Sequence, residues 1–318
     1  MNVRRVIPKD AIPSVEDPSF GETYNGDDGD RVVVIEGDDR PRAYPIRYLQ
    51  FHEIVNDVVG GDPVAVTWCP LCGSAIVYDR THDDTVLEFG VSGKLADDDL
   101  VMYDRGTESE WKQSSGRCID GPLSGAELAV RPASVTTWAT FRESYPEGVV
   151  LRPPGGTSEA AGEDATPREI DYDGTPYASY FEGDGYGLNA HVGEGDQREW
   201  NRTDLDPKTA VLGIEVGDDA LGVPLPTVRE AGGVVTASVG RRDVVVVATD
   251  DDGIHGYVDP GFELVLDADE GTIRGDGTTW EPATGRGDDG RRLERVPTRR
   301  LFAFAWRDDH GPDAFLDP

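Results

Sequence analysis

Short runs of β-branched and other apolar residues recur along this chain, and glycine, aspartate or proline closes most of them. The first half holds the runs RVVVIEG, PVAVTWC, SAIVYDR, TVLEFGVSG and DLVMYDR. Runs of this kind between turn-forming residues are typical of strands. The predicted fold class is therefore mainly β, or α+β with few short helices.

One helix is expected in the first half, over residues 47–59 with the sequence RYLQFHEIVNDVV. Apolar residues recur there at helical spacing and would form one buried stripe. The stripe consists of Tyr48, Phe51, Val55 and Val58.

The chain also resembles itself. At an offset of 180 residues, Gly37-Asp38-Asp39 matches Gly217-Asp218-Asp219, and PVAVTWCPLCGSAIVYD lies on DVVVVATDDDGIHGYVD. At an offset of 169, SEWKQSSGRCIDG matches TTWEPATGRGDDG, with Trp111 on Trp280. Self-similarity of this extent predicts two tandem, pseudo-duplicated β-rich units. The predicted boundaries are an N-terminal arm at 1–29, a first unit at 30–152, a linker or aromatic strap at 153–207, and a second, degenerate unit at 208–318.

Charge restricts the partners. The 318 residues include 62 acidic and 30 basic ones, with a net charge of −32. Nucleic acid is excluded as a partner because phosphate binding relies on clustered Lys and Arg, and an anionic membrane would repel the chain as well. Acidic residues spread along the whole chain favour a surface adapted to a salt-rich cytoplasm. Neither a signal peptide nor an apolar stretch long enough to span a membrane is apparent, so a soluble, cytoplasmic protein is expected.

Cysteine use points to a local site. Cys69 and Cys72 flank Pro70-Leu71 at the end of an apolar run, whereas the second copy has Thr249-Asp250-Asp251-Asp252 there. The turn can therefore form without sulfur. His52 likewise belongs to the first copy alone. Three cysteines in so long a chain exclude a disulfide framework.

Three interpretations of the Cys-x-x-Cys turn remain open. Its two thiolates can hold one metal ion, copper, zinc or iron, with His52 as the third ligand and Met102 or Asp104 in reserve. Alternatively, the pair is a thiol–disulfide oxidoreductase site. In the third interpretation both cysteines are small buried residues of a non-catalytic binding or scaffold protein. Phosphate loops, serine elbows, His-Glu-x-x-His pairs and dinucleotide fingerprints are missing, so none of those activities is predicted.

Several segments together resemble one family. They are PKDAIPSVEDPSF, AYPIRYLQFHEIVNDVVGGDPVAVTWCPLCGSAIVYDR, FGVSGKL, LVMYDRGTESEWKQSSGRCIDGPLSG, and TTW followed by YPEGVVL. With these motifs the chain resembles the DUF3179 family, a domain of unknown function found in bacteria and salt-loving archaea. The resemblance implies no activity, but it marks residues that match the family motif. These are His52, Glu53, Asn56, Asp57, Cys69, Cys72, Asp104, Thr107, Ser109, Trp111 and Gln113.

Overall fold

A computed structural model describes residues 1–37, 39–162 and 166–317. Residues 38, 163–165 and 318, which fall in the predicted first unit, strap and second unit, lie outside the described residues. Strands dominate and the helices are short, so the predicted mainly β class is confirmed. Among the described residues, no helix has the length and apolar character needed to cross a membrane.

The strands form several sheets, whose bounds all refer to the described residues. One six-stranded sheet has the order β19-β18-β26-β7-β6-β5, with β5 (Ile54–Val59), β6 (Asp62–Cys69), β7 (Ser74–Asp79), β18 (Ala210–Val216), β19 (Asp219–Pro224) and β26 (Arg299–Phe302). A second has the order β1-β10-β11-β12-β13, with β1 (Val3–Arg5), β10 (Phe89–Ala96), β11 (Asp99–Asp104), β12 (Glu110–Lys112) and β13 (Cys118–Asp120). A third has the order β14-β3-β4-β15-β2, with β2 (Phe20–Gly21), β3 (Arg31–Ile35), β4 (Arg42–Pro45), β14 (Ser134–Thr137) and β15 (Val149–Leu151).

Smaller sheets and the helices complete the fold. The smaller sheets are β20 (Val234–Val239), β21 (Arg242–Ala248) and β22 (Ile254–Val258); β23 (Val265–Asp267), β24 (Thr272–Gly275) and β25 (Thr278–Trp280); β16 (Thr157–Ser158) and β17 (Arg168–Glu169); β8 (Thr81–His82) and β9 (Thr85–Val86). The helices are α1 (Ile46–His52), α2 (Trp138–Ser144), α3 (Ala178–Glu182), α4 (Leu188–Val192), α5 (Leu225–Glu230) and α6 (Ala303–His310), with a 3₁₀ turn, η1 (Glu159–Ala161).

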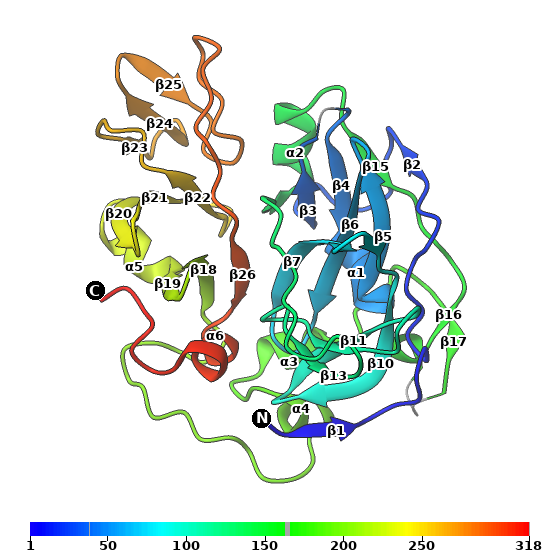
Figure 1. Cartoon of the computed structure of the whole chain (residues 1–318). Coiled ribbons are helices and arrows are strands. Elements are labelled where there is room, and N and C mark those ends of the chain that lie inside the picture. The colour runs from blue at the N-terminus through cyan, green and yellow to red at the C-terminus, as the bar shows by residue number, and fades with distance from the viewer. Residues whose placement is uncertain (38, 163–165, 318) are drawn as a thin grey trace.

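The six-stranded sheet joins the two halves of the chain, which lie side by side in Figure 1. Strand β26 of the second half pairs with β7 of the first through Arg300 and Ala75. The Phe302 backbone N–H, at the end of β26, donates to the carbonyl of Cys72 at 2.8 Å. Both halves also contribute to one apolar cluster, which contains Cys69 and Cys72 together with Phe304 and Trp306. The cysteine turn is therefore held from both halves.

The helix predicted over residues 47–59 is wrong in its second part. Helix α1 ends at His52, and Glu53 takes a φ of 57°, which stops the helix. Residues 54–59 form β5, which pairs with β6 along its whole length. Val58 is 48 % exposed, so it does not extend the buried stripe. The β-branched residues of this segment gain more from pairing with β6 than from a further helical turn.

The two halves share an order of elements. In the first, β3, β4, α1, β5, β6 and β7 follow one another, and in the second β18, β19, α5, β20, β21 and β22 do. Strand β14 pairs antiparallel with β3, as β26 pairs with β18. The hydroxyl of Tyr78 donates to the Gln113 carbonyl, and that of Tyr257 donates to the Pro282 carbonyl. These parallels support the predicted duplication, which stays a prediction.

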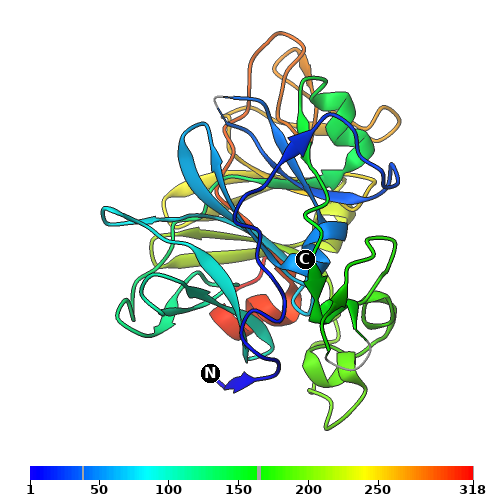
Figure 2. The same cartoon turned by 90° about the vertical axis from the view of Figure 1, so that its right-hand side faces the viewer.

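The segment after Leu151 packs against the first half with its aromatic residues. In Figure 2 it lies at the lower right of the molecule. The ring of Tyr172 packs on Tyr48, with 4.7 Å between ring centroids. The hydroxyl of Tyr180 donates to the Leu71 carbonyl at 2.6 Å. The segment thus fixes the backbone of the cysteine turn from outside the sheet.

Trp306 offers a test of this packing. Gly213 and Gly222 are paired across β18 and β19, and a β-carbon at either one would overlap the Trp306 indole. We expect Gly213→Ala to lower the free energy of unfolding by about 2 kcal/mol, because the buried indole must shift. Chemical denaturation measures this difference. Gly106→Ala is the control, since its β-carbon would meet only Asp104 at an ordinary 3.7 Å. Equal stability of the two variants would contradict the expectation.

Candidate metal centre

The two cysteines lie at opposite ends of a tight turn between β6 and β7. Cys69 is the last residue of β6 and pairs with Ser74, the first residue of β7. Gly73 takes a φ of 54° and its N–H donates to the Pro70 carbonyl at 3.3 Å. Because a left-handed residue closes the turn, glycine is favoured at this position. The geometry brings both side chains toward the same core.

A carboxylate completes a cluster with the two sulfur atoms. The Sγ atoms of Cys69 and Cys72 and one carboxylate oxygen of Asp99 all lie within 4.8 Å of one another. All three residues are buried. Asp99 is the first residue of β11, which follows an acidic turn at Asp97-Asp98. Three ligand atoms thus converge from two different sheets.

One oxygen of Asp99 is left without a donor. Its Oδ2 accepts from the Ser114 backbone N–H at 2.7 Å, whereas its buried Oδ1 has no hydrogen-bond partner among the described residues. Burial raises the pKa of Asp99 to about 6, although Lys112 acts in the opposite direction. A buried carboxylate oxygen without a partner is costly unless a cation or donor satisfies it.

Both cysteines are buried, and among the described residues neither forms a disulfide. Burial raises the pKa of Cys69 and raises that of Cys72 further, because Cys69 and Asp99 add their repulsion to a thiolate there. Lys112 lowers the pKa of Cys72, and its ammonium lies 2.5 Å from the Asp309 carboxylate of α6. The thiols are therefore protonated at neutral pH unless a metal ion displaces their protons.

His52, the third ligand predicted from the sequence, is bonded elsewhere. Its Nδ1 lies 2.9 Å from the Pro13 carbonyl and its Nε2 lies 2.7 Å from the Tyr172 hydroxyl. Burial lowers the pKa of His52, which keeps the ring neutral. In the described part of the chain, the donor atoms that gather within reach of one ion are those of the two cysteines and Asp99. Ligation by His52 would require one of its two hydrogen bonds to break.

Gln113, one of the residues that match the family motif, forms hydrogen bonds with both strands that flank the cysteine turn. Its amide nitrogen donates to the Thr67 hydroxyl at 2.7 Å, and its amide oxygen accepts from the Ser74 hydroxyl. It therefore ties β6 to β7 just before Cys69. Met102 and Trp111 face each other across β11 and β12 and are fully buried in the same apolar cluster as the cysteines.

The remaining predicted residues stabilise neighbouring loops and strands. Asn56 exchanges two hydrogen bonds with the backbone of Phe89. Asp57 accepts from Arg42 and from the Tyr44 hydroxyl. Asp104 accepts from the Thr107 N–H, and the Thr107 hydroxyl donates to Ser109. Each of these side chains already has hydrogen-bond partners in the protein, so a role in stabilising the local structure explains it.

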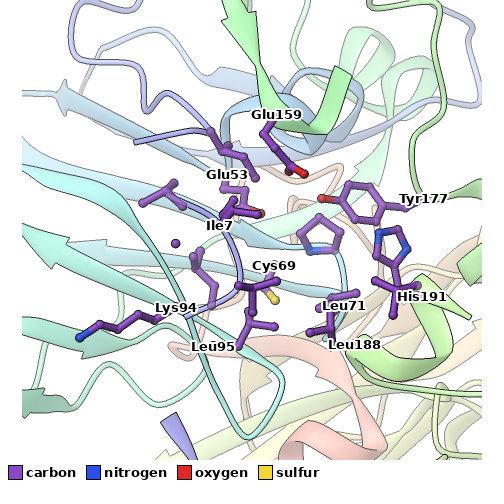
Figure 3. A pocket seen from close by; sticks show the side chains of 17 residues that line it. Ile7, Glu53, Cys69, Leu71, Lys94, Leu95, Glu159, Tyr177, Leu188 and His191 are labelled. Carbon is purple, nitrogen blue, oxygen red and sulfur yellow. The ribbon is translucent and has the colours of Figure 1, made fainter. Parts of the chain in front are cut away.

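Cys69 lines a pocket of about 130 Å³ that Figure 3 shows from close by. Most of its wall is apolar, with Leu71, Leu95 and Leu188 among the lining residues. The polar and charged groups come from Glu53, Lys94, Glu159, Tyr177 and His191. In Figure 3 the Tyr177 hydroxyl and the two glutamate carboxyls point toward one another. Of the three cluster residues, Cys69 is the one that lines this small, largely apolar pocket.

Glu53 is an unusual acid. It is 7 % exposed, and it occupies the strained backbone position that ends α1. Burial, with Glu159 and Asp99 nearby, raises the pKa of Glu53 to about 8. His191 stacks on Tyr177 with 4.9 Å between centroids, and its buried Nδ1 has no partner among the described residues. A strained, buried acid with a pKa near neutrality is typical of functional sites.

Sequence reasoning named Glu53 but missed Asp99, Glu159, Tyr177 and His191. Asp99 lies within the run DDD at 97–99, and such runs are common in this acidic chain. What distinguishes it is that an apolar strand, LVMYD, follows it at once. The other three belong to the segment predicted to be a linker or strap.

Fold and cluster together define a mainly β protein with a buried ligand cluster of two thiols and a carboxylate at the end of a strand hairpin. The chain belongs to the family described as "Protein of unknown function (DUF3179)", whose model matches residues 9–313. The family predicted from the sequence motifs is confirmed. No curated protein and no solved structure matches the chain.

The raised pKa of Glu53 has a consequence for stability. Its pKa is about 8 in the folded chain, against 4.5 for an ordinary glutamate. Between these values the folded state binds more protons than the unfolded state, so this group lowers stability as pH rises, by at most about 1.4 kcal/mol per pH unit. We expect metal-free Glu53→Gln to match the parent chain near pH 4.5 and to exceed it increasingly up to pH 8.

Denaturant unfolding at several pH values measures this effect. Glu230→Gln, at an exposed residue, is the control, and its difference from the parent should not change with pH. A Glu53→Gln difference that is flat between pH 4.5 and 8 would show that Glu53 titrates normally.

Proposed function

We propose that this protein binds one transition-metal ion through Cys69, Cys72 and Asp99. The observation that carries the proposal is the convergence of three buried residues with ligand atoms, one of which, Asp99, also has a carboxylate oxygen without a hydrogen-bond donor among the described residues. Two thiolates and a carboxylate together bear three negative charges, which a divalent ion and the nearby Lys112 ammonium would largely neutralise. By contrast, both ring nitrogens of His52, the third ligand predicted from the sequence, already have hydrogen-bond partners.

The donor set favours zinc or iron over copper(I). Copper(I) prefers soft thiolate and thioether ligands, whereas a carboxylate oxygen suits zinc and iron. Met102, the soft reserve ligand, packs in the apolar core between β10 and β12. Of the three metals considered from the sequence, zinc or iron therefore fits the site best.

The site is proposed to be open rather than closed. Three protein ligands leave a fourth position of a tetrahedral ion for water or a substrate atom, as in catalytic zinc sites. The pocket beside Cys69 supplies room for a small molecule, and its mostly apolar wall limits water. Glu53, with a pKa near 8, is suited to exchange a proton with a molecule bound there. We therefore favour a metal-assisted reaction on a small, partly apolar molecule.

Thiol redox chemistry is the second candidate, favoured by the closeness of the two sulfur atoms. The environment argues against it, because burial raises the pKa of both cysteines and the thiolate is the reactive form. In that case Cys69 and Cys72 would cycle between dithiol and disulfide with no metal bound.

Elemental analysis of protein purified without oxygen tests the metal proposal. We expect about one zinc or iron ion per chain in the parent. Cys69→Ser and Asp99→Asn should lower occupancy at least about tenfold, in keeping with loss of a ligand. Cys118→Ser is the matched control, since Cys118 is also buried but its thiol donates to the Asp120 carbonyl and does not belong to the cluster.

Two results would decide against this function. Absence of stoichiometric metal in the parent after growth with added zinc and iron would exclude it. Equal metal loss in Cys118→Ser would mean that the ions bind outside the cluster. A thiol count before and after mild oxidant, on the same samples, would then show whether Cys69 and Cys72 form a disulfide.

A further inference from the structure

A second, larger pocket lies on the other side of β6. Side chains alternate along a strand, so Cys69 faces the cluster described above while Trp68 faces away from it. Trp68 lines a pocket of about 630 Å³ between the two halves of the chain. Arg31 of β3 and Arg300 of β26 line it as well, with Ile46, Phe181 and Phe302 as apolar wall.

Three nitrogen donors of this pocket's lining residues are unsatisfied. Nη1 of Arg31, Nε of Arg300 and Nε1 of Trp68 are buried atoms without a hydrogen-bond partner in the described part of the chain. Trp68 as a whole is 4 % exposed. Each buried donor left unpaired costs about 1–3 kcal/mol, so three such donors among the residues that line one pocket require an explanation.

Arg300 is the most isolated of these groups. Within residues 1–37, 39–162 and 166–317, no carboxylate lies within 4.0 Å of its guanidinium, although the chain carries 62 acidic residues. Burial and the charge of Arg31 lower the pKa of Arg300 to about 10. Arg31 itself donates to the Asp251 carbonyl and lies 3.7 Å from the Asp252 carboxylate. Its second terminal nitrogen remains free for another acceptor.

Two of the three acidic residues that line the pocket, Asp30 and Asp173, are engaged elsewhere. Asp30 accepts from the Tyr24 hydroxyl and lies 3.6 Å from Arg47. Asp173 pairs with Arg47. Neither of them forms an ion pair with Arg300 among the described residues, and Asp252, which lies 3.7 Å from Arg31, acts on Arg300 only by its charge at a longer distance.

We propose that this pocket binds an oxyanion group, phosphate or carboxylate, between Arg31 and Arg300. Guanidinium groups match such anions by presenting N–H donors in a fixed plane, and the indole N–H of Trp68 adds a neutral donor. The apolar side chains of Ile46, Phe181 and Phe302 offer surface for the organic part of a small molecule. The anion would sit on the face of β6 opposite to the metal cluster, so this proposal does not depend on the metal.

Calorimetric titration of the full chain with inorganic phosphate and, separately, with succinate tests the proposal at constant ionic strength. We expect saturable binding of at least one of them with one site per chain. Arg31→Gln and Arg300→Gln should each weaken it about tenfold or more, since each removes a charged donor. Trp68→Phe, which keeps a ring of similar shape and loses only the N–H, should weaken it about threefold.

Arg241→Gln is the matched control, because it makes the same change of charge at an exposed residue outside the pocket. Its affinity should equal that of the parent. Binding of phosphate alone would assign a phosphate ligand, and binding of succinate alone would assign a carboxylate. Failure of both anions to bind the parent, or equal weakening in Arg241→Gln, would overturn the proposal.

The stability of the unliganded variants provides a second readout. An arginine kept for structure should destabilise the chain when it is replaced, whereas an unpaired buried cation should not. We expect unliganded Arg300→Gln to melt at the parent's temperature or above it, and phosphate or succinate to raise the melting temperature of the parent and of Arg241→Gln more than that of Arg300→Gln. A marked drop in melting temperature without ligand would identify Arg300 as a structural residue and overturn the proposal.

Discussion

Pairing between β26 and the β6–β7 hairpin is the contact on which the rest of the structure depends. The Phe302 N–H holds the Cys72 carbonyl, and Arg300 lies opposite Ala75. Through this contact the second half fixes the cysteine turn on one face of the sheet and closes the arginine pocket on the other. Strand β26, which lies between β18 and β7, also pairs with β7, which would otherwise be an exposed edge strand. Residues of both halves therefore line the arginine pocket, whereas the cluster of Cys69, Cys72 and Asp99 lies in the first half and the second half holds only the backbone of its turn.

The low dielectric constant of the protein interior makes the charged forms of the buried acids Asp99 and Glu53 less favourable than they would be at the surface. Asp99 and Glu53 are buried and have raised pKa values of about 6 and about 8. Lys112, held by Asp309, offsets part of the charge near Cys72. The ionised forms of Asp99, Glu53 and the cysteines become favourable together only when a cation is added, because each negative charge repels the others. The same reasoning, with signs reversed, applies to Arg300, whose pKa is lowered to about 10 by burial and by the charge of Arg31.

Strand content and the family could be predicted from sequence, because they depend on local composition and on sequence motifs. The end of α1 could not, since Glu53 stops the helix and β5 forms by pairing with β6, a tertiary contact. Asp99 could not be singled out either. In a chain with 62 acidic residues, the apolar run after Asp99 does not by itself reveal that its side chain is buried beside Cys72, because that burial depends on the packing of β11 against the hairpin.

The equivalent turn of the second half shows what the cysteines add. There the Asp251 Oδ1 accepts from the Thr249 hydroxyl and from the Gly253 N–H, so the side chain stabilises its own turn. In the first half the backbone and Gly73 close the turn, and the Cys72 thiol donates to the Asp98 carbonyl at 3.5 Å and contacts the Cys69 thiol. The carbonyl of Asp251 meanwhile receives Arg31 and so fixes one side of the arginine pocket. The turn at residues 249–253 therefore stabilises itself through Asp251 and positions Arg31 of the other half. The turn at residues 69–73 instead keeps two sulfur atoms close together, which is the arrangement that ligation of an ion requires.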